Sequence, residues 1–300
     1  MNRLSAEKRA QVIAALVEGN SIRATVRMTG VAKNTVTKLL VDMGTVCSTF
    51  QDRVMRDLSC ERVQCDEIWS FVGSKQKNVP AGKEGEYGDV WTWVALDADT
   101  KLVPTFHIGP RDMGQAQAFM TDLASRLSRR VQLTTDGHKA YLNAVDGAFG
   151  SDVDFAQLVK LYGQDSGSAA DRRYSPGVCI GATTQRVRGN PDPAHISTSY
   201  VERSNLTMRM SIRRFTRLTN GFSKKVENLA AAVSLHFAYY NFCRVHKTLG
   251  TTPAVAAGIA DRVWTLADLI ALLEEAEAVP VKRGSYAKTR AVKRQAELSD

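Results

Sequence analysis

Cysteine is scarce in this sequence, and the cysteines that are present form no binding pattern. The 300 residues contain five cysteines, an odd number, and no Cys-x-x-Cys pair. This argues against a disulfide framework and against a structural zinc site. No apolar run approaches the length of a membrane span, and the first residues lack the apolar core of a signal peptide. We therefore expect reduced thiols, a cytoplasmic location and no membrane partner.

Negative charge is also in the minority, and positive charge prevails. Lysine and arginine together number 40 against 31 aspartates and glutamates, which gives a formal net charge of +9. Such a balance favours a polyanionic partner, although many basic proteins bind nothing acidic. The length allows one large domain or two smaller ones with a sizeable core, and the hydrophobic fraction of 44% is typical of globular proteins.

Residues 63–73, VQCDEIWSFVG, are the most informative stretch of the chain. Their Val, Ile, Trp and Phe residues predict a buried strand, and Asp66 and Glu67 lie in its middle. A carboxylate is costly to bury without a partner, a metal or a water-filled cleft, so Asp66 is a candidate functional residue. Glu67 would point to the opposite face of the strand, and we exclude it from the candidate site.

Two further acids complete the candidate site. Asp136 stands before Gly137, where an ordinary turn residue is the alternative, and Glu202 stands near a helix start, where helix-dipole stabilisation is the alternative. Together with Asp66 they would bind Mg²⁺, or Mn²⁺ in its place, for phosphoryl transfer on DNA. Asn205 and Arg209 follow Glu202 on one helix face and could contact metal-bound water or phosphate, and Arg213 extends this basic surface. A solvated helix face is the alternative.

The first 44 residues predict a small helical DNA-binding unit. Helices over residues 22–28 and 33–43, joined by a turn at Gly30, match the helix-turn-helix pattern. Its second helix begins with polar side chains suited to phosphates and base edges. These are Lys33, Asn34, Thr35, Thr37 and Lys38. A plain three-helix bundle with a solvated polar face fits the same pattern.

The remaining chain predicts an α/β domain between a linker and a helical extension. We expect a polar linker over 45–61, a catalytic domain over 62–243, a helical extension over 244–279 and a basic tail over 280–300. The order of elements is three strands, helix, strand, helix, strand, then helices, which predicts a mixed five-stranded sheet flanked by helices, as in RNase H. Its first and fourth strands would lie side by side and bring Asp66 to Asp136. Residues 163–197 predict a long loop.

Three blocks of this sequence resemble those of insertion-sequence-one transposases, which belong to the DDE group with an RNase H-like core. They are CDEIWSFVG at 65–73, TTDG at 134–137 and YVERSNLTMR at 200–209. Residues 21–40 resemble the helix-turn-helix of that family, and HKTLG at 246–250 is similar to a motif of integrase-type transposases. The resemblance implies that Asp66, Asp136 and Glu202 are the metal-binding catalytic residues. The cysteine-rich zinc segment of the founding family form has no counterpart here.

The resemblance also implies a function. A bacterial, nucleoid-associated DNA transposase would bind the terminal inverted repeats of an insertion sequence, free 3′-hydroxyls by hydrolysis and join them to target DNA. Double-stranded DNA and a second copy of the chain, in a homodimer or larger synaptic assembly, would be its partners. Two alternatives remain open: a nuclease of the same fold that cuts without joining, and a non-enzymatic helix-turn-helix regulator whose C-terminal domain only oligomerises.

Overall fold

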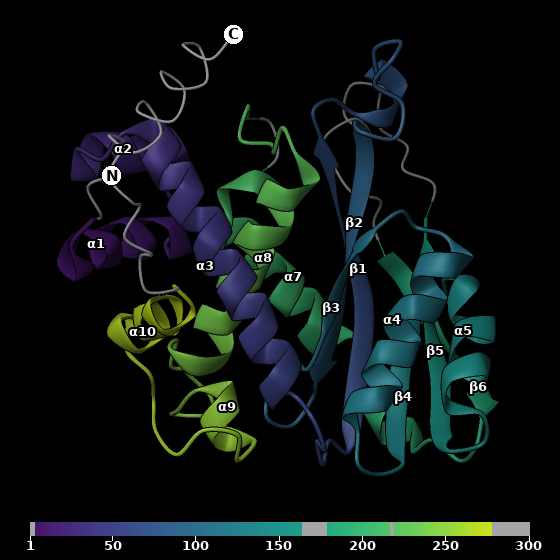
Figure 1. Ribbon diagram of the computed structural model, residues 1–300. Helices are drawn as coiled ribbons and strands as arrows, with labels where there is room; N and C mark the ends of the chain where they lie inside the picture. The colour runs from purple at the N-terminus through teal and green to yellow at the C-terminus, as the bar shows by residue number, and fades with distance from the viewer. Residues whose placement is uncertain (1–3, 164–178, 217–218, 278–300) are drawn as a thin grey trace, which may run out of the picture.

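A six-stranded mixed sheet forms the centre of the molecule (Figure 1). The computed structural model describes residues 4–163, 179–216 and 219–277. The strand order is β3-β2-β1-β4-β5-β6, in which β1 pairs antiparallel with β2 and parallel with β4. The strands are β1 (Arg62–Val72), β2 (Gly88–Asp97), β3 (Phe106–Gly109), β4 (Val131–Asp136), β5 (Val153–Tyr162) and β6 (Cys179–Arg188). The predicted neighbourhood of the first and fourth strands is confirmed, and the architecture is consistent with the RNase H-like fold.

The prediction of five strands, with a single long loop over 163–197, is wrong in one respect. Residues Cys179–Arg188 of that segment form β6, which pairs antiparallel with β5 at the sheet edge. Side chains along β6 are exposed almost throughout, so the strand lacks the apolar alternation by which a half-buried strand is recognised.

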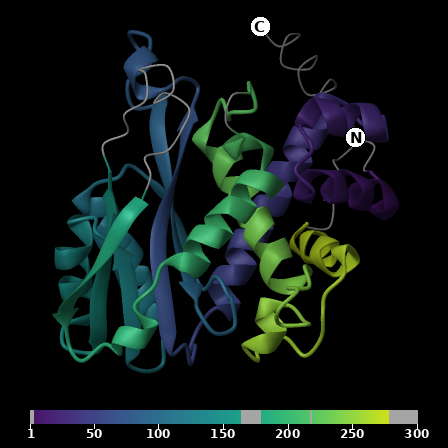
Figure 2. The same cartoon turned by 180° about the vertical axis from the view of Figure 1, so that it is seen from behind.

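Helices cover both faces of the sheet. On one face lie α4 (Met113–Arg126) and α5 (Ala140–Phe149), packed over a core that includes Trp93, Phe119 and Tyr141. On the other face lie α7 (Ser199–Ser211) and α8 (Val226–Phe242), as the view from behind shows (Figure 2). The helix expected to begin near Glu202 is therefore α7, which ends at Ser211 and is followed by a short 3-10 helix, Arg213–Phe215.

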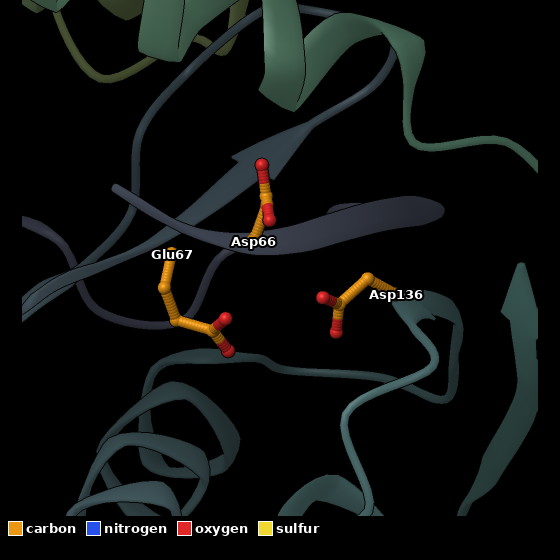
Figure 3. A group of neighbouring side chains, drawn as sticks. All are labelled: Asp66, Glu67 and Asp136. Atoms are coloured by element: carbon orange, nitrogen blue, oxygen red, sulfur yellow. The ribbon is translucent and has the colours of Figure 1, made fainter. Parts of the chain in front are cut away.

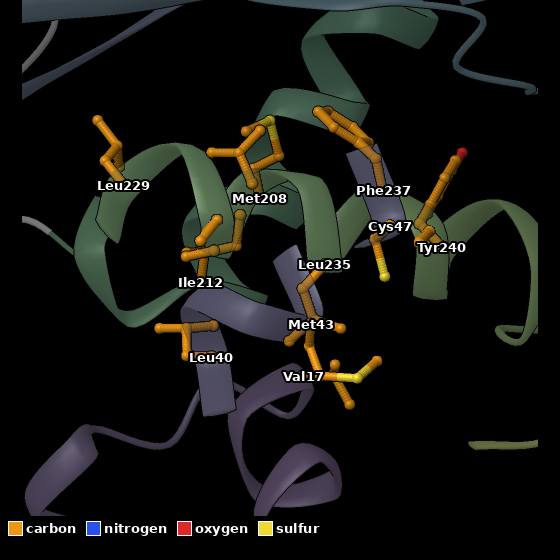
Figure 4. Packing of buried hydrophobic residues seen from close by; sticks show 14 of the residues in the cluster. Val17, Leu40, Met43, Cys47, Met208, Ile212, Leu229, Leu235, Phe237 and Tyr240 are labelled. Atoms are coloured by element: carbon orange, nitrogen blue, oxygen red, sulfur yellow. The ribbon is translucent and has the colours of Figure 1, made fainter. Parts of the chain in front are cut away.

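The N-terminal helices pack directly onto this second layer. They are α1 (Ala6–Val17), α2 (Ile22–Thr29) and α3 (Lys33–Val54). Leu40, Met43 and Cys47 of α3 meet Leu235 and Phe237 of α8 in one buried cluster (Figure 4). A polar linker was predicted from residue 45, but α3 continues through it to Val54. The prediction failed because a glycine such as Gly44 is typical of a helix end. Here Gly44 lies inside α3, and its lack of a side chain lets α3 approach Ala231 of α8 closely. A Cβ atom at position 44 would lie 2.3 Å from the Cα of Ala231.

The C-terminal part of the described chain is helical, as expected. It contains α9 (Pro253–Ala256) and α10 (Leu266–Ala276), and α10 packs against α1 and α3. A capping box of Thr265 and Asp268 opens α10. Among the residues that the structure describes, no helix combines the length and the apolar character needed to cross a bilayer. The predicted basic tail over 280–300 lies outside the described residues.

Candidate active site

The three predicted acids come from three separate segments and line one cavity of about 660 Å³. The pairing of β1 with β4 ends at Cys65 and Thr135, so Asp66 and Asp136 follow immediately where the two strands separate. Glu202 lies in the first turn of α7, which crosses the sheet above this point. The cavity is also lined by Arg111, His138, Lys160 and Thr198. Parallel strand ends and a helix start therefore converge on one acidic cavity.

Asp66 is half-buried, and its surroundings disfavour the charged form of its carboxyl. Burial, and secondly the nearby charge of Asp136, raise the pKa of its carboxyl to about 6. Asn205 of α7 opposes this shift, because its Nδ2 donates a hydrogen bond to Asp66 Oδ2 at 2.9 Å. The Oδ1 atom of Asn205 is buried and has no hydrogen-bond partner in the described part of the chain. The site thus combines a carboxyl of raised pKa with a buried acceptor that has no donor in the described residues.

Glu67 belongs to this group, contrary to the expectation from strand alternation. One oxygen each of Asp66, Glu67 and Asp136 lies within 4.8 Å of the others (Figure 3). The backbone of Glu67 does face the α4 and α5 side, but its long side chain reaches the gap where β4 ends. Burial, and secondly Asp136, raise the pKa of Glu67 to about 7. Alternation predicts the direction of a Cα–Cβ bond and not the position of a carboxylate three bonds away.

Two cations compensate the acids. Arg111, from the segment before α4, donates to Glu67 Oε2 at 3.1 Å and to Asp136 Oδ2 at 3.2 Å. Lys160 of β5 donates to Glu202 Oε2 at 2.5 Å. Neither was a sequence candidate, because Arg111 lies in no motif and Lys160 is one of many basic residues. Only their place opposite the acids distinguishes them.

Glu202 is positioned through the start of its helix. The side chain of the preceding Thr198 caps no backbone N–H of α7 and instead donates to Glu202 Oε1 at 2.5 Å. Gln64, buried on β1, supplies the cap: its Oε1 accepts the N–H groups of Tyr200 at 2.9 Å and Val201 at 3.1 Å. A β1 side chain two residues before Asp66 therefore fixes the helix that carries Glu202. An isolated glutamine in a strand gives no sequence signal for this function.

The predicted DNA contacts fall into two groups. Lys33, Asn34, Thr35 and Lys38 are exposed at the start of α3, Thr37 is half-buried there, and Lys38 pairs with Asp42. The others belong to α7 and the 3-10 helix after it: Asn205 is buried against Asp66, while Arg209 and Arg213 are half-buried, and Arg213 lies beside the N-terminal helices. A role of any of these residues in binding DNA stays a prediction.

The donor set fits a hard divalent cation. All candidate ligands are carboxylate or amide oxygens, which Mg²⁺ and Mn²⁺ prefer, and no sulfur or imidazole is needed. A bound cation would stabilise the charged forms of Asp66 and Glu67, whose pKa values are raised. The geometry leaves two ligand sets open, Asp66 with Asp136 and Glu202, or Asp66 with Glu67 and Asp136.

No protein-family model matches this chain. No curated protein matches it either. Solved structures similar to it include a piggyBac transposase synaptic complex with hairpin DNA, with 11% identity over 94% of this chain and 75% of that chain and a TM-score of 0.38. A Mos1 mariner paired-end complex with Mn is 12% identical over 79% and 77%, with a TM-score of 0.26. Endonuclease V from Bacillus subtilis is 14% identical over 62% and 88%, with a TM-score of 0.24. At these TM-scores the similarities say nothing of the activity of this chain.

Proposed function

We propose that this chain is a DNA transposase of an insertion sequence. It would bind terminal inverted repeats and carry out metal-dependent cleavage and strand transfer with Asp66, Asp136 and Glu202 as catalytic, metal-binding residues. The observation that supports this proposal is the convergence of these acids, from β1, β4 and α7, on one cavity. The same three acids carry the resemblance to insertion-sequence-one transposases.

The cavity contains the groups that phosphodiester chemistry needs. Divalent metal bound there would supply an activated oxygen nucleophile and neutralise charge at the scissile phosphate. Asn205 orients Asp66, and Gln64 and Thr198 orient Glu202. Arg111 and Lys160 place positive charge at the cavity wall, where a DNA phosphate would be bound. The predicted phosphate contacts of Arg209 and Arg213 would extend this surface along the DNA.

Recognition of the element ends would fall to α2 and α3. The αL residue Gly30 joins the two helices, and the exposed first turn of α3 presents Lys33, Asn34 and Thr35. Lysine contacts would serve phosphates, and Asn34 could read adenine in the major groove. Because two ends must be held together for joining, the active form would be a homodimer or a larger assembly on double-stranded DNA.

Two assays separate the transposase from its alternatives. In a Mg²⁺-dependent cleavage assay on element ends, Asp66→Asn, Asp136→Asn and Glu202→Gln should each abolish cleavage, while Asp146→Asn, a surface acid paired with Arg188, should retain it. No cleavage by the wild type, together with unchanged binding of element ends by all three variants, would leave only the regulator.

A pre-cleaved end with a free 3′-hydroxyl then tests joining. The transposase predicts covalent transfer of this strand to a target plasmid, lost in the same three variants. Cleavage without any transfer would identify the nuclease.

A further inference from the structure

Four aromatic rings form a row on the sheet face above α4. Trp69 and Phe71 are two residues apart on β1, and Trp91 of β2 lies directly opposite Trp69. Phe222 stands beside Phe71, with ring centroids 4.9 Å apart, where Ser223 bonds to the end of β1. All four are half-buried. The hairpin of β1 and β2 rises beyond the first turn of α4, and a short 3-10 helix, Gln76–Asn78, lies at its tip (Figure 1).

The contrast with Trp93 shows that these rings are not simply core. Trp93 lies on the same face of β2, two residues beyond Trp91, and is fully buried against Phe119 and Tyr141. Trp69 and Trp91 retain exposed surface at positions where a polar residue would be ordinary. Neighbouring apolar side chains that remain partly exposed can mark a binding surface.

Cations accompany the row along its length. The Arg111 guanidinium carbon lies 5.0 Å from the centroid of the Trp91 ring, and Lys75 Nζ lies 5.6 Å from that of Trp69. Lys224 and Lys225 follow Phe222 in the chain and are exposed. Aromatic faces that bind bases, interleaved with cations that bind the backbone, are the chemistry of single-stranded nucleic acid recognition.

The row lies on the Glu67 face of β1, and Arg111, which lines the acid cavity, links the row to it. Glu67 precedes Trp69 on the same strand face, and the same Arg111 that covers Trp91 bonds to Glu67 and Asp136. A strand that passes the acids would therefore meet Trp91 and Trp69 next.

We propose that Trp69, Phe71, Trp91 and Phe222 form a stacking platform for unpaired bases of single-stranded DNA beside the acid cavity. The platform rests on the proposed function in one respect, because cleavage at a DNA end would supply the need for unpaired bases. The charge of the neighbouring lysines and Arg111 selects a polyanion over a second protein chain or a lipid surface as the occupant.

Binding of fluorescein-labelled dT12, without divalent metal, tests the platform. Trp69→Leu and Phe71→Leu keep apolar volume but remove the ring, and each should weaken dT12 binding about fivefold or more. Trp69→Phe should restore most of the affinity. Trp264→Leu is the matched control, because Trp264 is also half-buried and packs on Phe50 and Phe242, but far along the chain in the α8 and α10 region. Its affinity for dT12 should equal that of the wild type.

Equal dT12 affinity for Trp69→Leu, Phe71→Leu and the wild type would overturn the platform. An equal loss in Trp264→Leu would do the same, because the effect would then be a general consequence of removing a ring. Stacking would also be contradicted if Trp69→Leu and Trp69→Phe lost dT12 affinity to the same extent while their melting temperatures stayed unchanged. The two proposals can fail separately. If dT12 binding does not depend on the rings while cleavage depends on the acids, only the platform fails. If dT12 binding depends on the rings while the acid variants remain active, only the proposed function fails.

Discussion

Replacing Asp66 by asparagine should stabilise the metal-free protein at pH 8. Burial, and then Asp136, raise the pKa of Asp66 from its ordinary 3.8 to about 6, so the folded state opposes the charged form. At about 1.4 kcal/mol per pH unit, this corresponds to about 3 kcal/mol of unfolding free energy. Asparagine removes the charge and can still accept the hydrogen bond from Asn205 Nδ2.

The gain must depend on pH with a definite sign. The wild-type protein carries no penalty below pH 3.8, where Asp66 is protonated in both states, and loses stability as the pH rises through about 6. The difference in unfolding free energy between Asp66→Asn and the wild type should therefore be absent near pH 4, grow up to about pH 6 and then remain constant. Urea unfolding at several pH values, in EDTA, measures it.

Asp154→Asn provides a control of opposite sign. A hydrogen bond from Arg130 lowers the pKa of Asp154 to about 2, so its charge stabilises the fold above pH 3.8, and its removal should destabilise the protein at pH 8. Mg²⁺ should remove the stability difference between Asp66→Asn and the wild type, because the metal binds and stabilises the wild type but not the variant. A less stable Asp66→Asn variant at pH 8 in EDTA would refute the reasoning.

Three further predictions concern the supports of the site. Gln64→Leu should lower the free energy of unfolding by about 0.5–2 kcal/mol, because it removes the cap of α7, and it should weaken Mn²⁺ binding in calorimetry. Gln64→Glu keeps an acceptor and should lower the stability less. Unchanged stability in Gln64→Leu would exclude the cap. Lys160→Gln should tighten Mn²⁺ binding about twofold to fivefold without DNA, because metal no longer competes with an ammonium group, and weaker binding would contradict this competition. Gly44→Ala should lower stability by about 1–3 kcal/mol through the clash of α3 with α8, measured by urea unfolding, while Gly114→Ala, whose Cβ would meet only Asp112 Oδ1 at 3.4 Å, should be close to neutral.

The central part of the fold could be predicted from local patterns. The apolar strand around Asp66 and the turn after Asp136 lie at places where the chain signals its own structure, and the order of elements then brings β1 beside β4. The capping box of Thr265 and Asp268 is likewise a purely local interaction, between residues three apart in the sequence.

What could not be predicted depends on contacts between distant residues. The exposed strand β6 exists because β5 offers it a free edge, and α3 continues past Gly44 because α8 fits against it. The carboxylate of Glu67 joins the acids because β4 ends opposite it, and Arg111, Lys160 and Gln64 acquire their places only through tertiary structure. Each of these positions looks ordinary along the sequence.

The most direct test of the metal site is an anomalous difference map from crystals soaked in MnCl₂. The account predicts a manganese peak in the cavity, in contact with the carboxylates of Asp66 and Asp136 and beside Glu202. Manganese held by Glu67 and Asp136 alone, with Asp66 and Glu202 still bonded to Asn205 and Lys160, would contradict it, as would a cavity that takes up no manganese.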